Sequence, residues 1–87
     1  MEQAYIKEKT FDKINFTQNP IAKGEYENCT FINCDLSNSA LANIKFIECE
    51  FEGCNLSMAK LNNTALQDAK FVNCKMMGMH FDVAKYL

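Results

Sequence analysis

An apolar or aromatic residue recurs at every fifth position along this chain, and that period constrains the fold more than any other feature. Counting in steps of five from Phe31 meets seventeen positions, all of them apolar or aromatic. Helices and strands repeat their apolar positions about every 3.6 and 2.0 residues, so neither pattern explains a strict period of five. The seventeen central positions are Ile6, Phe11, Phe16, Ile21, Tyr26, Phe31, Leu36, Leu41, Phe46, Phe51, Leu56, Leu61, Leu66, Phe71, Met76, Phe81 and Tyr86.

A second inward track lies two residues before each central position. From Cys29 onward its members are small or apolar, and none is charged. Two inward positions in every five describe a short bent strand whose side chains alternate between two faces. All five cysteines lie on this track, where a free thiol behaves as a small buried hydrophobe.

The residue two after each central position predicts the corners. Of the twelve such positions from Asn28 to Val83, eight are Asn or Gly. These residues tolerate the positive φ that the third residue of a type II turn requires. Each pentapeptide is therefore expected to be a short extended piece followed by a turn near a right angle. Four corners close a square, so one coil takes 20 residues and the chain supplies about four coils.

The pentapeptides Cys34-Asp35-Leu36-Ser37-Asn38 and Cys54-Asn55-Leu56-Ser57-Met58 carry a family resemblance. They resemble pentapeptide repeat proteins, whose pattern is a small residue, a polar residue and then Leu or Phe. The resemblance implies an all-β, right-handed quadrilateral β-helix. We expect a single solenoid over residues 1–87, with an irregular N-terminal cap and first coil over 1–25 and regular coils over 26–87.

The Cys- and Phe-rich repeats are similar to those of Qnr-type proteins, which guard DNA gyrase and topoisomerase IV from quinolones. The resemblance implies a non-catalytic protein that binds a type II topoisomerase by mimicking DNA. A generic protein-interaction or structural scaffold stays an alternative. So does the N-terminal portion of a longer pentapeptide-repeat protein, because Qnr-type proteins continue for about twice as many coils.

The sequence offers no motif for catalysis, a metal or another cofactor. The cysteines are spaced Cys-x4-Cys twice with Cys74 alone, whereas zinc sites usually bring Cys-x2-Cys pairs. The only histidine, His80, lies at an outward position, and a catalytic role would need an activating partner and a cleft. We therefore expect no enzyme, no cofactor and no metal site, and His80 is expected to be a surface residue.

Charge and hydropathy argue against nucleic acid and membranes as partners of this protein. The net charge of −2 argues against direct nucleic-acid binding. The chain has no 18-residue apolar run, and its N-terminus is not typical of a signal peptide, so a cytoplasmic protein without membrane contact is expected. An acidic edge of Glu48, Glu50 and Glu52 is a candidate partner-binding surface, although a plain solvated face explains it as well.

The ends of a solenoid expose core residues and unpaired strand edges, so they need covering. The repeat runs without interruption to the last residue. A two-fold pairing of C-terminal coils would cover both ends with the same patch. We therefore expect a homodimer, with Met76, Phe81, Tyr86 and Leu87 at the candidate interface.

Overall fold

The computed structural model describes residues 3–80, and its regular structure consists of short strands. Each strand spans three or four residues around a central position of the five-residue period. In chain order they are β1 (Ala4–Lys7), β2 (Thr10–Asp12), β3 (Gly24–Glu27), β4 (Thr30–Ile32), β5 (Lys45–Ile47), β6 (Glu50–Glu52), β7 (Ala65–Gln67) and β8 (Lys70–Val72). We call the twenty-residue segments 4–23, 24–43 and 44–63 repeats 1, 2 and 3, and the described part of the next one, 64–80, repeat 4.

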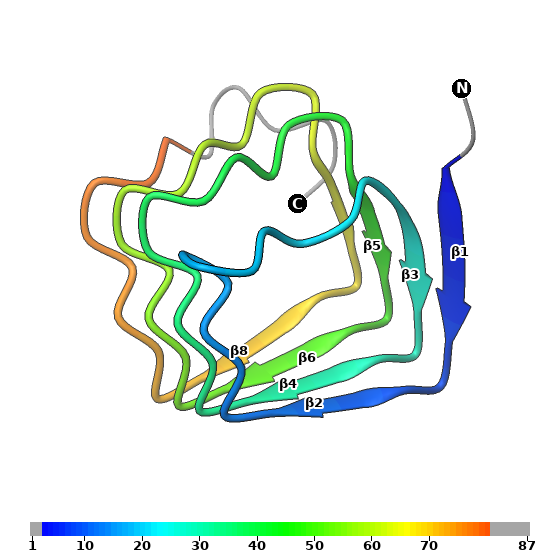
Figure 1. The fold of residues 1–87 in the computed structure, drawn as a ribbon, viewed down its shortest axis with the longest axis horizontal. Coiled ribbons are helices and arrows are strands. Elements are labelled where there is room, and N and C mark those ends of the chain that lie inside the picture. Colours follow the sequence, from blue (N-terminus) through cyan, green and yellow to red (C-terminus); the bar gives the residue numbers. More distant parts are fainter. Residues whose placement is uncertain (1–2, 81–87) are drawn as a thin grey trace.

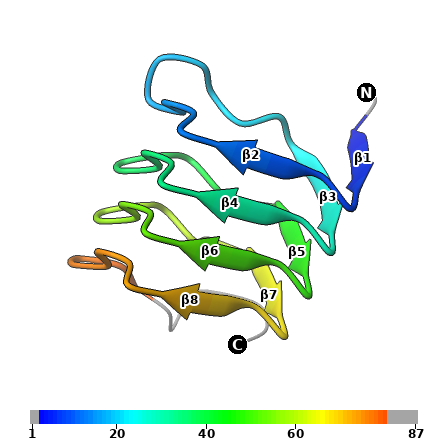
Figure 2. The same cartoon turned by 90° about the horizontal axis from the view of Figure 1, so that it is seen from below.

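The strands form two parallel sheets, in the orders β1-β3-β5-β7 and β2-β4-β6-β8. Paired residues of neighbouring strands lie twenty positions apart in the sequence, as in Tyr26↔Phe46 and Phe31↔Phe51. The two sheets meet at a corner, and turns close the other two faces (Figure 1). The repeats stack along one axis (Figure 2), so the predicted β-solenoid with a twenty-residue period is confirmed. Its right-handed sense and the count of four coils stay predictions.

Aromatic stacks that run along the solenoid axis fill one part of the core, and columns of leucine fill another. Phe31 and Phe51 stack with ring centroids 4.8 Å apart and planes inclined by 6°. Phe11 and Phe71 extend this stack at 4.7 and 5.1 Å. Since neighbouring strands lie about 4.8 Å apart, the ladder itself holds like side chains at stacking distance.

The corners have the backbone predicted for them. Every residue two after a central position from Asn28 to Gly78 has a positive φ, between 52° and 74°. Asn and Gly fill most of these places because other L-residues adopt this conformation at a cost. Glu48, Met58 and Asp68 are the exceptions, and each adopts the same conformation, because the stacked repeats above and below fix the path of the chain.

The corners differ in their hydrogen bonding. The N–H three residues after Leu36, Leu41, Leu56 and Leu61 donates to the Leu carbonyl at 3.0–3.2 Å, which closes a tight turn. The corners after Tyr26, Phe31, Phe46 and Phe51 make no such bond within residues 3–80. Each of these four central residues lies in a strand, whose backbone is already committed to hydrogen bonds between repeats. The corner after Leu66 in β7 differs from them, since the Ala69 N–H donates to the Leu66 carbonyl at 3.4 Å.

Repeat 1 departs from the others after its second strand. β1 and β2 pair in register with β3 and β4, but the segment from Thr17 to Lys23 does not follow the ladder. The Lys23 ammonium donates to the carbonyls of Ala40 and Ala42 at 2.9 and 2.8 Å. In the next repeat, backbone N–H groups bind the equivalent carbonyls of Lys60 and Asn62. Lys23 therefore replaces two ladder hydrogen bonds.

Candidate functional site

The acidic corner lies where β5 passes into β6. Glu48 is the exposed corner residue, and Glu50 is the half-buried first residue of β6. They line a shallow hollow of about 300 Å³ with Asp68 and Lys70 of the next repeat. Glu50 and Lys70 are register partners, so an ammonium lies beside the carboxylates. The corner presents three carboxylates and one ammonium over two successive repeats.

Glu52 lies outside this hollow. It is the exposed last residue of β6, and its register neighbours are Ile32 and Val72. The structure therefore brings Glu48 and Glu50 together and adds Asp68 and Lys70, which the sequence analysis did not include. The signal that could have found them is the twenty-residue period, because Asp68 and Lys70 follow Glu48 and Glu50 by one repeat.

Of the residues expected at a dimer interface, only Met76 is described. It is half-buried and packs against the hydrophobic core. Phe81, Tyr86 and Leu87 lie outside the described residues.

The cysteines face the core, as their inward positions predict. Cys29, Cys34, Cys49 and Cys54 are buried, Cys74 is half-buried, and all five are free thiols. Each donates to the carbonyl of the residue 23 positions earlier, at 3.1–3.5 Å. Burial raises the pKa of the Cys49 and Cys54 thiols to about 11, which keeps them protonated and unreactive at neutral pH. Within residues 3–80, no group of three or more His, Cys, Asp or Glu could hold a metal ion.

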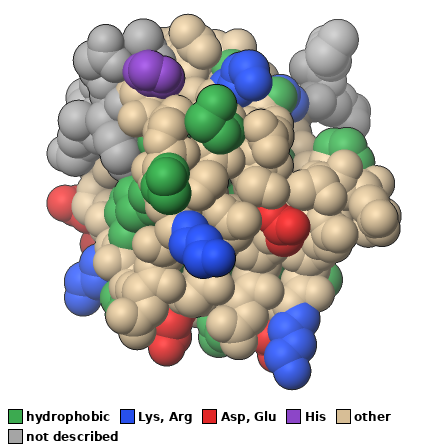
Figure 3. All heavy atoms as spheres, turned by 90° about the vertical axis from the view of Figure 1, so that its left-hand side faces the viewer, with side chains coloured by type: hydrophobic (Ala, Val, Ile, Leu, Met, Phe, Trp, Pro, Cys, Tyr) green, Lys and Arg blue, Asp and Glu red, His purple; other side chains and the backbone are tan. Residues whose placement is uncertain are grey.

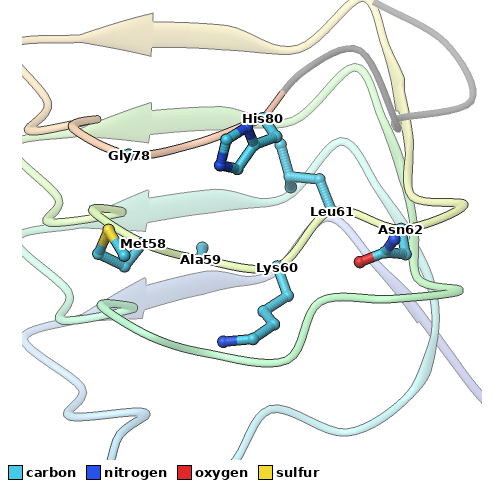
Figure 4. A pocket seen from close by; sticks show the side chains of 7 residues that line it. All are labelled: Met58, Ala59, Lys60, Leu61, Asn62, Gly78 and His80. Atoms are coloured by element: carbon cyan, nitrogen blue, oxygen red, sulfur yellow. The ribbon is translucent and has the colours of Figure 1, made fainter.

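His80 is exposed, as expected, and lines a second hollow of about 280 Å³ (Figure 4). The other lining side chains come mainly from residues 58–62, with Met58, Lys60 and Leu61 among them. None of the residues that line this hollow is an acid or a thiol. An imidazole without such a partner lacks the group that would orient or activate it for acid–base catalysis.

One turn face contains Asp35 and Ser37 and their equivalents in the other repeats. Its charges are not gathered as they are at the acidic corner. Figure 3 shows this face, where charges of both signs are scattered, with the single histidine near one edge.

Within residues 3–80 there is no helix long and apolar enough to cross a membrane.

These features define a β-solenoid that carries charged and polar side chains on its outer faces. The family model for the pentapeptide repeat region matches residues 25–86, and the chain belongs to the pentapeptide repeat family. No curated protein matches the chain in sequence.

Solved structures of QnrB1, titled a plasmid-mediated fluoroquinolone resistance protein, share the fold. The full-length structure aligns over 90% of this chain with a TM-score of 0.71 and 22% identity. A trypsin-treated R167E form aligns over 82% of this chain with a TM-score of 0.60 and 31% identity. The chain spans 49% and 35% of the lengths of these two structures.

Proposed function

We propose that this protein is a non-catalytic binding module that occupies the DNA-binding surface of a type II topoisomerase through its acidic corner. The observation that carries the proposal is the convergence of Glu48, Glu50 and Asp68 on one exposed corner of successive repeats. Stacking fixes the spacing of these carboxylates along the axis at about 4.8 Å per repeat. A rigid row of negative charge is a feature that a DNA-binding surface recognises.

The likeness to QnrB1 supports this choice of partner. QnrB1 is a plasmid-mediated fluoroquinolone resistance protein, and this chain has the same fold over most of its length. The Lys70 ammonium offsets part of the negative charge of the corner. Recognition of the corner would therefore depend on where the three carboxylates lie more than on its net charge. A protein that occupies a surface in this way needs no reactive group, and the buried thiols of Cys49 and Cys54 are protonated at neutral pH.

The test is a DNA gyrase supercoiling assay in the presence of a quinolone. We expect the protein to restore supercoiling, and the combined variant Glu48→Gln, Glu50→Gln and Asp68→Asn to lose most of that protection. Glu52→Gln and Lys60→Gln are the matched controls, because both side chains lie outside the acidic hollow. Failure of the unaltered protein to protect gyrase would overturn the proposal and leave the scaffold alternative. Equal loss in the controls would show that the corner is not the contact.

A further inference from the structure

A third hollow separates the irregular part of repeat 1 from repeat 2. It has a volume of about 340 Å³, with Phe16, Pro20 and Ile21 on one side and Ser37, Ser39 and Ala40 on the other. In Figure 2 the segment that follows β2 rises away from the repeat beneath it. The hollow therefore lies where the ladder between repeats is interrupted.

The next pair of repeats shows what a complete ladder contains at this place. The Asn38 N–H donates to the Ser57 carbonyl at 2.9 Å, and the Ser39 carbonyl accepts from the Lys60 N–H at 2.9 Å. Two consecutive residues of repeat 2 thus supply one donor and one acceptor to repeat 3. Asn38 has a φ of 58°, which is the corner conformation that directs both groups to one side.

Repeat 1 does not supply these groups to repeat 2. Its equivalent residues are Gln18 and Asn19, and both of their N–H groups donate to the Asn15 carbonyl, at 3.4 and 3.1 Å. Within residues 3–80, the Ser37 carbonyl and the Ala40 N–H consequently have no hydrogen-bond partner. A donor and an acceptor of repeat 2 are left unmatched beside the hollow.

A side chain of the hollow is unmatched as well. The Ser39 hydroxyl is buried without a hydrogen-bond partner among the described residues. Thr64, at the equivalent position of another pentapeptide, donates to the Leu41 carbonyl at 2.7 Å. A buried polar group that lacks a partner is costly, so the Ser39 hydroxyl shows that the packing of repeat 1 on repeat 2 is incomplete at this hollow.

We propose that this hollow binds a turn segment of a partner protein that takes the place left by Gln18 and Asn19. The segment has Gly or Asn at a residue of positive φ, whose N–H donates to the Ser37 carbonyl. The carbonyl of its next residue accepts from the Ala40 N–H. The segment is uncharged, because the only charged residue of the hollow is Lys23, whose ammonium already binds Ala40 and Ala42.

The first experiment measures binding of a blocked tripeptide, acetyl-Ser-D-Ala-Ser-N-methylamide, by amide NMR of the ¹⁵N-labelled protein. D-Alanine favours positive φ and L-alanine disfavours it, so we expect the D-peptide to bind about tenfold more tightly than the L-peptide. Saturable shifts should centre on the Ala40 amide. An ester in place of the D-alanine amide removes the donor to Ser37 and should weaken binding. Equal binding of all three peptides, or no saturable shift, would overturn the proposal.

The second experiment removes the donor of the protein. Ala40→Pro should abolish peptide binding and retain the fold, because the Ala40 N–H is not used by the ladder. Ala40→Ser keeps the N–H and should keep binding. Without peptide, the Ala40 amide should exchange with solvent much faster than the hydrogen-bonded Lys60 amide. Equal protection of the two amides, or dimerisation through this hollow, would show that it is already closed.

Discussion

The thiol of Cys54 donates a hydrogen bond to the main-chain carbonyl of Phe31, 23 residues earlier, at a distance of 3.1 Å. This contact joins the corner after Phe51 to the equivalent corner, after Phe31, in the preceding repeat. At the tight turns the central carbonyl accepts from a backbone N–H three residues later, as Leu36 does from Ser39 at 3.1 Å. At the corners after Tyr26, Phe31 and Phe51, where no backbone N–H three residues later donates, the central carbonyl accepts from a cysteine thiol of the next repeat. The cysteines are therefore structural hydrogen-bond donors as well as core residues.

Cys54→Ala should destabilise the protein by about 1–3 kcal/mol, because it removes a buried donor and leaves a small void. The free energy of unfolding in urea measures this loss. Cys74→Ala is the control, since Cys74 makes the equivalent bond to Phe51 but is only half-buried. Its cost should be smaller, and a larger cost there would contradict the role of burial.

Stability should fall in alkaline solution. Burial raises the pKa of Cys49 and Cys54 to about 11 from an ordinary value of 9.0. The unfolded thiols ionise above that ordinary value while the folded ones stay neutral, so their contribution is complete below pH 9.0 and is lost between there and about pH 11. Urea midpoints at a series of pH values test this. A flat profile across that range would mean that the thiols are accessible to water.

Phe51→Ala should cost about 3–5 kcal/mol, as expected for truncation of a buried aromatic residue. Phe51 is 1% exposed and lies between Phe31 and Phe71 in the stack. Lys60→Ala, at an exposed outward position, should stay within about 0.5 kcal/mol of the unaltered protein. Thermal unfolding followed by circular dichroism compares the two, and similar midpoints would show that the five-residue register is wrong.

Lys23→Met should destabilise the protein by about 1–2 kcal/mol, because the carbonyls of Ala40 and Ala42 lose the ammonium that binds both. Methionine keeps most of the length of the side chain. Lys60→Met is the matched control, since the Lys60 ammonium makes no hydrogen bond within the described residues. Chemical denaturation should separate the two variants, and equal stability would show that water serves these carbonyls equally well.

The expected homodimer stays a prediction. Light scattering over a concentration series should give a mass near twice 9.9 kDa. Met76→Lys, at the described part of the expected interface, should shift the equilibrium towards the monomer. A monomer at every concentration that unfolds cooperatively would contradict the pairing.

The sequence by itself determined the period, the inward tracks and the corners. Each is a local property. The apolar residue at every fifth position packs in the core, and the Asn or Gly two residues later permits positive φ. The burial of the cysteines followed from the same frame. Of the acidic edge, Glu48 and Glu50 share a hollow and Glu52 lies outside it, and a partner for this edge stays a prediction.

Only the tertiary structure decided which groups meet between repeats. The acceptor of each thiol lies 23 residues away, so it depends on how repeats stack and not on any local pattern. The same holds for Asp68 and Lys70 beside Glu48 and Glu50, and for Lys23, which binds carbonyls 17 and 19 residues later. Stacking converts a one-dimensional period into contacts between distant residues, and the irregular segment of repeat 1 leaves some of those contacts unmade.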